Sequence, residues 1–298
     1  MFYDGINEFD EIKANIISGF SGATYNPDFI FFCVDFDGTL VKICKNPLDV
    51  YAPEQLKSFL KASGKIKNVI VCVITGRELD DIQNRVGICK NIIYSGNHGF
   101  EIKSYYDSFK IDFLVKNAEK YIPLIEKTLS EINKLQKTEL QNLIVEDKKF
   151  SISMHYRLLN SGETKILKKY ANSLLAKNPL FNEYLHITKG KKILEIRPKI
   201  DWNKGCACDY IVNEFSKAAS KKELNILRVN IGDDITDETM FVPSYKIKTA
   251  SDGTNINVKT INCVIGKKKS LAEIYLDGYK YTPVFIENIL SAFKEFKI

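Results

Sequence analysis

Arginine, histidine and tryptophan are scarce in this sequence. Five of its 43 basic residues are arginine, and it holds three histidines and one tryptophan. Lysine supplies the rest of the positive charge and is scattered along the chain, so the net charge of +6 is weak support for binding nucleic acid or an anionic membrane. We therefore expect neither partner. Where lysine is so strongly preferred, positions that keep arginine or histidine are candidates for a planar or titrating side chain.

The seven cysteines lack the spacing of a zinc site or of a disulfide framework. They are odd in number and spread along the chain, with no CxxC pair. The longest apolar runs, Phe29 to Val34 and Val69 to Ile74, have six residues each, whereas a membrane-spanning helix needs about 20. The first residues also lack the basic and apolar regions of a signal peptide. The sequence thus predicts a soluble, cytoplasmic protein.

Short, continuously apolar runs predict strands that are buried on both faces, as in a parallel sheet. Between the first two runs, residues 53–60 predict a helix that starts with proline, and a second helix is expected at 78–86. This alternation predicts a doubly wound, mainly parallel α/β core of the Rossmann type, with ligands at the carboxyl ends of the strands. The expected strands are 29–34, 69–74, 92–94 and 225–231, with 246–249 and 262–265 as candidate extensions.

The middle of the chain has a different rhythm. It predicts, in order, helix 118–137, strands 142–146 and 150–156 joined tightly by 147–149, helix 164–176, and strands 184–188 and 192–197 around a turn at Gly190. This order is typical of an antiparallel sheet backed by two helices. We therefore expect an inserted α+β cap domain at 107–199, a discontinuous core at 29–106 and 200–298, and a helical lead-in at 1–28.

Two aspartates, Asp35 and Asp37, stand where the first apolar run ends. Side chains alternate along an extended chain, so both carboxylates project to the same side, and Gly38 allows a tight turn. Neighbouring carboxylates repel each other and need a cation or a shared proton, and Mg²⁺, a hard ion with oxygen ligands, meets that need. One carboxylate could then attack phosphorus while the other handles protons. The alternative is a surface turn with two solvated aspartates.

A second acidic cluster, Asp233 to Glu238, follows the run at 225–231 in the same way. If both strands are parallel in one sheet, the two clusters lie at the same edge and can share the ion. The alternative is a capped helix start. The two readings are compatible, with Asp233 binding the metal and the later acids beginning the helix.

Two further motifs supply groups that phosphoryl transfer needs. Thr75, Gly76 and Arg77 end the second apolar run and offer a hydroxyl and backbone N–H groups to phosphoryl oxygens. Lys204 opens a helix directly after the expected cap and could neutralise charge in the transition state. A lone lysine is ordinarily a solvated surface residue, so this role depends on its position and on the preceding Trp202-Asn203.

Four segments resemble, in chain order, the four signature motifs of haloacid-dehalogenase-like phosphatases, over residues 29–265. They are DFDGTL, Thr75-Gly-Arg, Lys204-Gly and GDDxTDE. The run Gly96-Asn-His-Gly-Phe-Glu101 and the segments 145–157 and 195–198 narrow the resemblance to the trehalose-6-phosphate phosphatase family. Thr75 stands where serine is commoner, and residues 1–28 match no family motif.

The resemblance implies a role for each motif residue. Asp35 would be the nucleophile and Asp37 the general acid/base. Mg²⁺ would be bound by Asp35, the backbone carbonyl of Asp37, and Asp233. Thr75 and Lys204 would hold the transferring phosphoryl group. The implied supporting residues are Asp234 and Asp237.

The resemblance also implies a sugar-binding surface. Glu146 and Lys148 are two apart on an expected strand and hence on one face, where a carboxylate beside an ammonium suits a polyhydroxylated disaccharide. The alternative for this pair is a solvated hairpin with a surface ion pair worth little. The implied substrate-binding residues are Gly76, Arg77, Asn97, His98, Glu146, Lys148, His155, Arg157 and Glu195.

Taken together, these motifs predict an Mg²⁺-dependent phosphatase that hydrolyses trehalose 6-phosphate to trehalose and phosphate, the last step of trehalose biosynthesis. One alternative is a related enzyme for another sugar phosphate, such as sucrose 6-phosphate. Another is a non-catalytic regulatory module that binds a sugar phosphate, which the intact motifs argue against. Many members of this family carry a glycosyltransferase domain, which we do not expect in this protein, and a trehalose-6-phosphate synthase is a candidate partner.

Overall fold

The computed structural model describes residues 3–17, 25–107, 109–219, 221–241, 246–249 and 255–295. The chain divides into two compact units. The first comprises Met1–Ile43, Val50–Phe113 and Asn203–Ile298, and the second comprises Cys44–Asp49 and Leu114–Trp202. The expected boundaries between core and cap are 106/107 and 199/200, and the structure places them at 113/114 and 202/203. The short segment 44–49 also belongs to the second unit.

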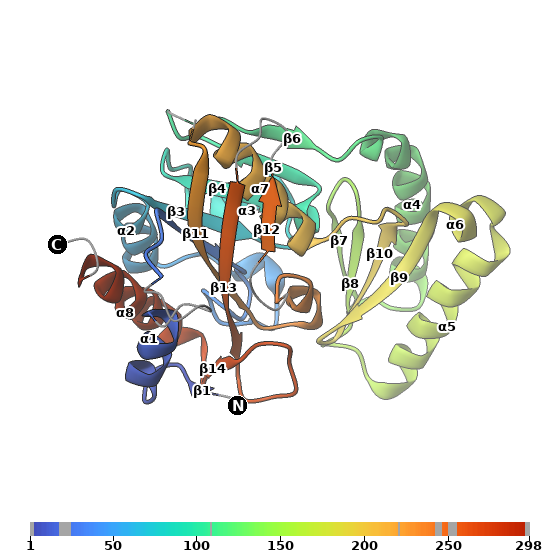
Figure 1. Cartoon of the computed structure of the whole chain (residues 1–298). Coiled ribbons are helices and arrows are strands. Elements are labelled where there is room, and N and C mark those ends of the chain that lie inside the picture. The colour runs from blue at the N-terminus through green and yellow to red at the C-terminus, as the bar shows by residue number, and fades with distance from the viewer. Residues whose placement is uncertain are drawn as a thin grey trace. The chain divides into compact units, whose positions relative to one another are not determined.

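The first unit is built on a ten-stranded sheet (Figure 1), in the order β1-β14-β13-β11-β2-β3-β4-β5-β6 with β12 paired to β13. Every pairing from β1 to β4 along this order is parallel, while β5 and β12 pair antiparallel with their neighbours. The doubly wound, mainly parallel fold is therefore confirmed. The strands are β1 (Tyr3–Asp4), β2 (Phe29–Val34), β3 (Val69–Ile74), β4 (Ile92–Gly96), β5 (Glu101–Ser104), β6 (Asp112–Leu114), β11 (Glu223–Gly232), β12 (Lys246–Thr249), β13 (Asn255–Ile265) and β14 (Ile274–Leu276).

The central strands read as apolar runs because helices cover the sheet. All of β3 and all of β2 except Phe29 are buried. One face of these strands presents Phe31, Cys33 and Cys72 to the helix α7, which contributes Cys208 to the same apolar cluster. The helices of this unit are α1 (Phe9–Ile17), α2 (Glu54–Ser63), α3 (Leu79–Val86), α7 (Lys204–Ala219) and α8 (Thr282–Glu295).

The N-terminal segment contributes to the first unit. Strand β1 pairs in parallel with β14, and the ring of Phe9 in α1 packs edge-on against Phe285 in α8, with ring centroids 6.2 Å apart. In the described part of the expected helical lead-in at 1–28, an edge strand is followed by a helix, and residues 1–2 and 18–24 lie outside that part.

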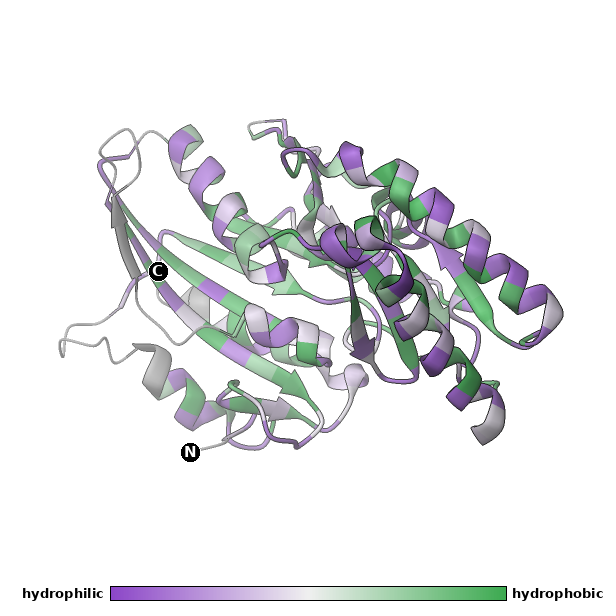
Figure 2. Cartoon of the chain, turned by 90° about the vertical axis from the view of Figure 1, so that its right-hand side faces the viewer, coloured by the Kyte–Doolittle hydropathy of each residue, from purple (hydrophilic) through white to green (hydrophobic). Residues whose placement is uncertain are grey.

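The second unit has a four-stranded antiparallel sheet, in the order β7-β8-β10-β9, with two long helices. Ile132 of α4 and Leu167 of α5 share one apolar cluster with Ile152, Met154 and Ile196 of the strands. Figure 2 shows alternating hydrophobic and hydrophilic residues along the helices, as one buried face requires. The predicted α+β architecture is confirmed. Its elements are α4 (Ile122–Thr138), β7 (Ile144–Asp147), β8 (Ile152–His155), α5 (Ser161–Lys177), α6 (Pro179–Tyr184), β9 (Leu185–Gly190) and β10 (Ile193–Pro198).

Some local expectations differ from the structure. The short helix α6 was not predicted, although Asn178 accepts hydrogen bonds from its first N–H groups and Pro179 starts it. Gly190 ends β9, and the left-handed residue of that hairpin is Lys192, with a φ of 64°. Pro53 is the N-cap of α2 instead of its first helical residue.

Candidate active site

The carboxyl ends of β2, β3 and β11 lie at one edge of the first unit's sheet, because the three strands are parallel neighbours. Asp35, Thr75 and Asp233 follow these strands directly, and the N–H of Asp35 donates to the carbonyl of Ile231 at 2.9 Å. Carboxylate oxygens of Asp35, Asp233 and Asp237 all lie within 4.8 Å of one another. The two acidic clusters of the sequence thus meet in space.

Lys204 lies buried between two of these carboxylates. Its Nζ donates to Oδ1 of Asp35 and to Oδ1 of Asp237, at 2.7 Å each, and the three residues are 3%, 5% and 0% exposed. Burial would lower the pKa of Lys204, but the charges of Asp237 and Asp35 more than offset it, so its pKa is raised and the ammonium persists. The backbone N–H groups of Asp233 and Asp234 donate to the other oxygen of Asp237, at 2.8 and 2.9 Å.

The carboxyl of Asp35 has a raised pKa. Burial raises its pKa well above the ordinary value, and Lys204 opposes this shift, while the like charges of Asp237 and Asp233 add to it. Its second oxygen accepts a hydrogen bond from Thr39 Oγ1 at 3.1 Å. A cation at this point would relieve the repulsion, and carboxylate oxygens are the donors that hard divalent ions prefer. The cluster could therefore hold a metal ion.

A glycine brings the two acidic loops together. Gly38 has a φ of +88°, which favours glycine, and a Cβ at this position would lie 2.5 Å from the carboxylate of Asp233. Beside it, Lys268 of the loop after β13 donates to the backbone carbonyl of Asp233. Lys268 was not predicted, because it stands among three consecutive lysines with no pattern that distinguishes it.

The carboxylate of Asp37 does not join this cluster. Its two oxygens accept from Nε and Nη2 of Arg77 at 2.6 and 2.8 Å, and Nη1 of Arg77 donates to Asp81 at 3.0 Å. The spacing predicts a cation or a proton shared by the Asp35 and Asp37 side chains. In the structure the residues after β2 turn instead of continuing as a strand, so the two side chains have separate partners.

The loop after β3 and the residues after β4 are joined through their backbones. The N–H of His98 donates to the carbonyl of Thr75 at 2.9 Å, and the N–H of Asn97 donates to the carbonyl of Arg77 at 2.6 Å. Asn97 and His98 have left-handed backbones, with φ of 49° and 57°. A Cβ on Gly76 would lie 2.6 Å from the His98 ring, so glycine allows this close approach. These predicted residues are therefore neighbours.

In the second unit, most of the predicted residues share one face of the sheet. Glu146 pairs in register with Ser153, and Ser153 with Glu195, so all three point to the same side. Lys148 Nζ lies 3.3 Å from Oε1 of Glu195, and His155 Nε2 lies 2.5 Å from Oε2 of Glu146. The alternative of a solvated hairpin does not fit Lys148, because this residue is buried and its Nζ contacts Glu195.

Two serines complete this face. The hydroxyls of Ser151 and Ser153 donate to Oε1 of Glu195 at 3.1 and 3.3 Å. The sequence reasoning missed them, although their spacing of two before His155 places all three on one face. Arg157 lies elsewhere, where its guanidinium donates to the backbone carbonyls of Cys44 and Lys191.

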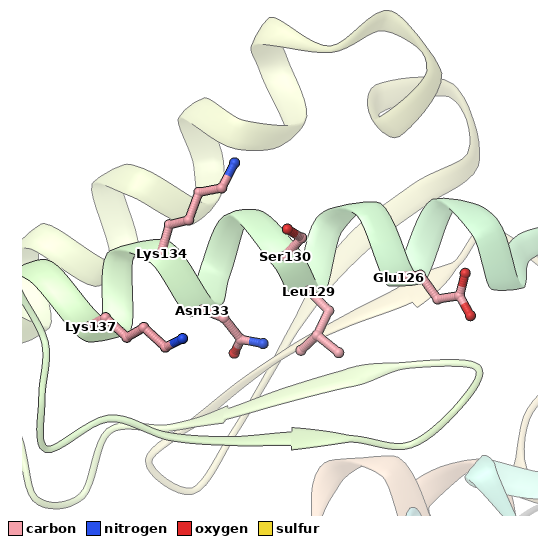
Figure 3. Close-up of a pocket in the computed structure, with 6 residues that line it drawn as sticks. All are labelled: Glu126, Leu129, Ser130, Asn133, Lys134 and Lys137. Carbon is pink, nitrogen blue, oxygen red and sulfur yellow. The ribbon is translucent and has the colours of Figure 1, made fainter.

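A shallow surface pocket of about 380 Å³ lies along α4 (Figure 3). None of the predicted site residues lines it. Its lining residues are Glu126, Leu129, Ser130, Asn133, Lys134 and Lys137.

Among the described residues, no helix combines the length and the apolar character needed to cross a bilayer.

Known proteins are similar to this chain in sequence and in fold. It is 30% identical over 217 residues to a probable trehalose-phosphate phosphatase D of Arabidopsis thaliana, which covers 71% of this chain and 56% of that protein. It is also 30% identical over 213 residues to a trehalose-phosphate phosphatase of Mycobacterium bovis, with coverages of 71% and 50%. The chain thus spans about half the length of the curated relatives it matches.

The fold agrees with these similarities. The structure of the C-terminal domain of C. albicans trehalose-6-phosphate phosphatase aligns with a TM-score of 0.66, at 20% identity and with 98% of each chain covered. The family model of trehalose-phosphatase matches residues 33–280, a range that runs from β2 to the residues before α8. The chain belongs to the trehalose-phosphatase family.

Proposed function

We propose that this protein is a Mg²⁺-dependent phosphatase that hydrolyses trehalose 6-phosphate through an aspartyl-phosphate on Asp35. The observation that carries the proposal is the buried arrangement of Asp35, Lys204 and Asp237 beside Asp233, at the carboxyl edge of a parallel sheet. Membership of the trehalose-phosphatase family supports the choice of substrate.

The chemistry divides between two aspartates. An oxygen of Asp35 forms a bond to phosphorus while the bond from phosphorus to the sugar oxygen breaks, and the leaving oxygen takes a proton from Asp37. Asp37 then accepts a proton from the water that attacks the aspartyl-phosphate, which regenerates Asp35 and releases phosphate. The Thr75 hydroxyl and the Lys204 ammonium hold the phosphoryl oxygens, and Lys204 offsets charge that develops on them.

The residues present fit Mg²⁺. Asp35 and Asp233 supply buried carboxylates, and the backbone carbonyl of Asp37 is the third ligand we propose. Asp237 serves Lys204 and the backbone N–H groups of Asp233 and Asp234, which makes it a support for the site. When bound, the ion would neutralise the crowded negative charge around the phosphoryl group.

The polar face of the second unit's sheet is the sugar-binding surface we propose. Buried charged groups such as Lys148 and Glu195 suit the hydroxyls of a disaccharide because both are held in fixed positions. The Asn97 and His98 pair of the first unit, beside Gly76, would add contacts to the substrate. The other contributors we propose are Arg77, Glu146, His155 and Arg157.

A phosphate-release screen over sugar phosphates, with and without Mg²⁺, tests the function. We expect trehalose 6-phosphate to give the highest kcat/KM, only with Mg²⁺, and Asp35→Asn to abolish turnover. A preference for sucrose 6-phosphate would contradict the proposed substrate but not the proposed phosphatase reaction. Binding of the sugar phosphate without release would identify a regulatory module.

The sugar-binding surface has its own test. Glu146→Ala and Lys148→Ala should reduce kcat/KM for trehalose 6-phosphate by about 100-fold, and reduce that for p-nitrophenyl phosphate by about twofold at most, because an aryl phosphate makes no sugar contacts. The exposed Lys149→Ala, one residue away in the same hairpin, is the matched control. Equal losses on both substrates would contradict the proposed surface.

We further propose a cytoplasmic location and an association with a trehalose-6-phosphate synthase, which would supply the substrate. Cell fractionation tests the location. Co-purification with the synthase tests the association, and we expect it to persist in active-site variants such as Asp35→Asn. Separate elution of the two proteins at cellular concentrations would contradict the association.

A further inference from the structure

Arg85 is a scarce arginine outside every recognised motif, and the structure connects it to Asp37. Its Nε lies 2.8 and 2.7 Å from the two oxygens of Asp81, and its Nη1 donates to the carbonyl of Val50. Asp81 also accepts from Arg77 at 3.0 Å, and Arg77 holds both oxygens of Asp37. Four charges of alternating sign therefore form one connected chain, which we name the Asp37–Arg85 relay.

The relay is built from buried cations and partly exposed anions. The side chains of Arg77 and Arg85 are 6% and 4% exposed, and those of Asp37 and Asp81 are 34% exposed each. A buried guanidinium without a carboxylate partner would be strongly unfavourable, so Arg77 and Arg85 each depend on the carboxylates beside them. Asp81 and Arg85 lie four residues apart on α3, and the helix therefore presents them to each other in a fixed geometry.

We propose that Asp81 and Arg85 are positioning residues for proton transfer by Asp37. Asp81 orients the Arg77 guanidinium, whose planar fork then sets the orientation of the Asp37 carboxylate. Arg85 in turn fixes Asp81, and the Val50 carbonyl together with the Tyr51 ring, 5.0 Å from the guanidinium, fixes Arg85. The inference rests on the proposed function, in which Asp37 protonates the leaving oxygen.

The relay has a consequence that a structural ion pair would not have. A sugar oxygen leaves as a strongly basic alkoxide unless it is protonated, whereas p-nitrophenolate leaves as a stabilised anion. A misplaced Asp37 should therefore slow cleavage of the sugar phosphate and leave cleavage of p-nitrophenyl phosphate nearly unchanged. Because kcat/KM covers the steps up to loss of the leaving group, it reports this difference whichever later step limits kcat.

The test compares kcat/KM of Asp81→Asn and Arg85→Lys on trehalose 6-phosphate and on aryl phosphates of graded leaving-group basicity. A general acid contributes about 10²–10⁴-fold, so its misplacement by Asp81→Asn should cost about tenfold on the sugar phosphate, against about twofold at most on p-nitrophenyl phosphate. Arg85→Lys should lie between Asp81→Asn and the wild type, because an ammonium keeps the charge without the planar fork.

Asp209→Asn is the matched control. Asp209 pairs with the buried Arg228 at 2.6 Å, with side-chain exposures of 34% and 5%, and neither residue belongs to the relay. It should lower thermal stability as much as Asp81→Asn while keeping the wild-type dependence on leaving-group basicity. A uniform loss of kcat/KM across all leaving groups in Asp81→Asn and Arg85→Lys would overturn the relay.

A further variant separates the relay from the proposed function. Asp37→Asn should give the steepest dependence on leaving-group basicity of all variants. If it does and Asp81→Asn matches the wild type, the relay is wrong and the role of Asp37 stands. If Asp37→Asn itself shows no steeper dependence, the proposed acid role fails, and the relay fails with it.

Discussion

Gly38 meets two demands of the active-site loop, a left-handed backbone and room for the carboxylate of Asp233. Gly38→Ala should lower stability by about 1–2 kcal/mol through the backbone alone. It should also lower kcat, because the new methyl group displaces Asp233. Thermal unfolding and phosphate release measure the two effects.

Gly87 provides the matched control for Gly38. Its φ of +87° is almost the same as that of Gly38, but a Cβ there would meet no atom within 4 Å. Gly87→Ala should therefore lose stability through its backbone and keep its activity. If both variants lose kcat equally, the close approach of Gly38 to Asp233 does not matter for catalysis.

His186 is a histidine that the family motifs do not explain. It pairs in register with Arg197, and its Nδ1 is buried without a hydrogen-bond partner. Burial lowers its pKa below the ordinary value of 6.5, and the charges of Arg197 and Lys199 lower it further. The folded protein therefore resists protonation that the unfolded chain accepts.

This depressed pKa predicts acid sensitivity. The stability contribution of neutral His186 is present above about pH 6.5 and is lost as the pH falls through the lowered folded value. His186→Asn should thus lose less thermal stability than the wild type between pH 7.5 and pH 5. Parallel Tm profiles of the two proteins would contradict this prediction.

At the scale of elements, the start of α5 depends on a reciprocal cap. Asn160 Oδ1 accepts from the N–H of Glu163 at 2.9 Å, and Glu163 Oε2 accepts from the N–H of Asn160 at 2.8 Å. Asn160→Ala should cost about 1 kcal/mol, measured by denaturant unfolding. Asn160→Ser keeps a capping oxygen and should cost far less, so equal losses would show that the cap contributes little.

Element boundaries could be predicted where the pattern is local. Continuous apolar runs gave β2 and β3 to the residue, because strands buried on both faces need no polar alternation. The β13 strand starts at Asn255, seven residues before the expected 262, since its first half alternates polar and apolar residues. The helix α6 was missed because six residues are too few for a helical period to appear.

At the scale of the whole molecule, metal binding should stabilise the fold. A ligand that binds only the folded state at 100 times its Kd adds about 2.7 kcal/mol. Mg²⁺ should therefore raise the Tm of the wild-type protein. Asp233→Asn should abolish that rise, and its Tm without Mg²⁺ should equal or exceed that of the wild type, because one of the like charges around Asp35 is removed.

Differential scanning fluorimetry with and without Mg²⁺ measures this response without any substrate. Asp209→Asn, which alters a carboxylate of the first unit outside the cluster, should keep the full rise. A Tm rise that persists in Asp233→Asn would place the ion elsewhere.

The positions of the acids after two apolar runs predicted that they share one edge of the sheet. Parallel neighbouring strands have their carboxyl ends at one edge, so acids that follow β2 and β11 must lie close together. Strand type predicted that Asp35 and Asp233 lie at the same edge if both strands are parallel in one sheet, and the family motifs placed Lys204 with the phosphoryl group.

The partner of each charged side chain, in contrast, depends on how the chain folds. Asp37 pairs with Arg77, forty residues away, and Arg77 and Arg85 both contact Asp81. Glu195 contacts Lys148 and two serines. These choices depend on which groups are buried together and must neutralise one another. Spacing along the chain carries no information about such burial, and the Asp37–Arg85 relay was therefore visible only in the folded protein.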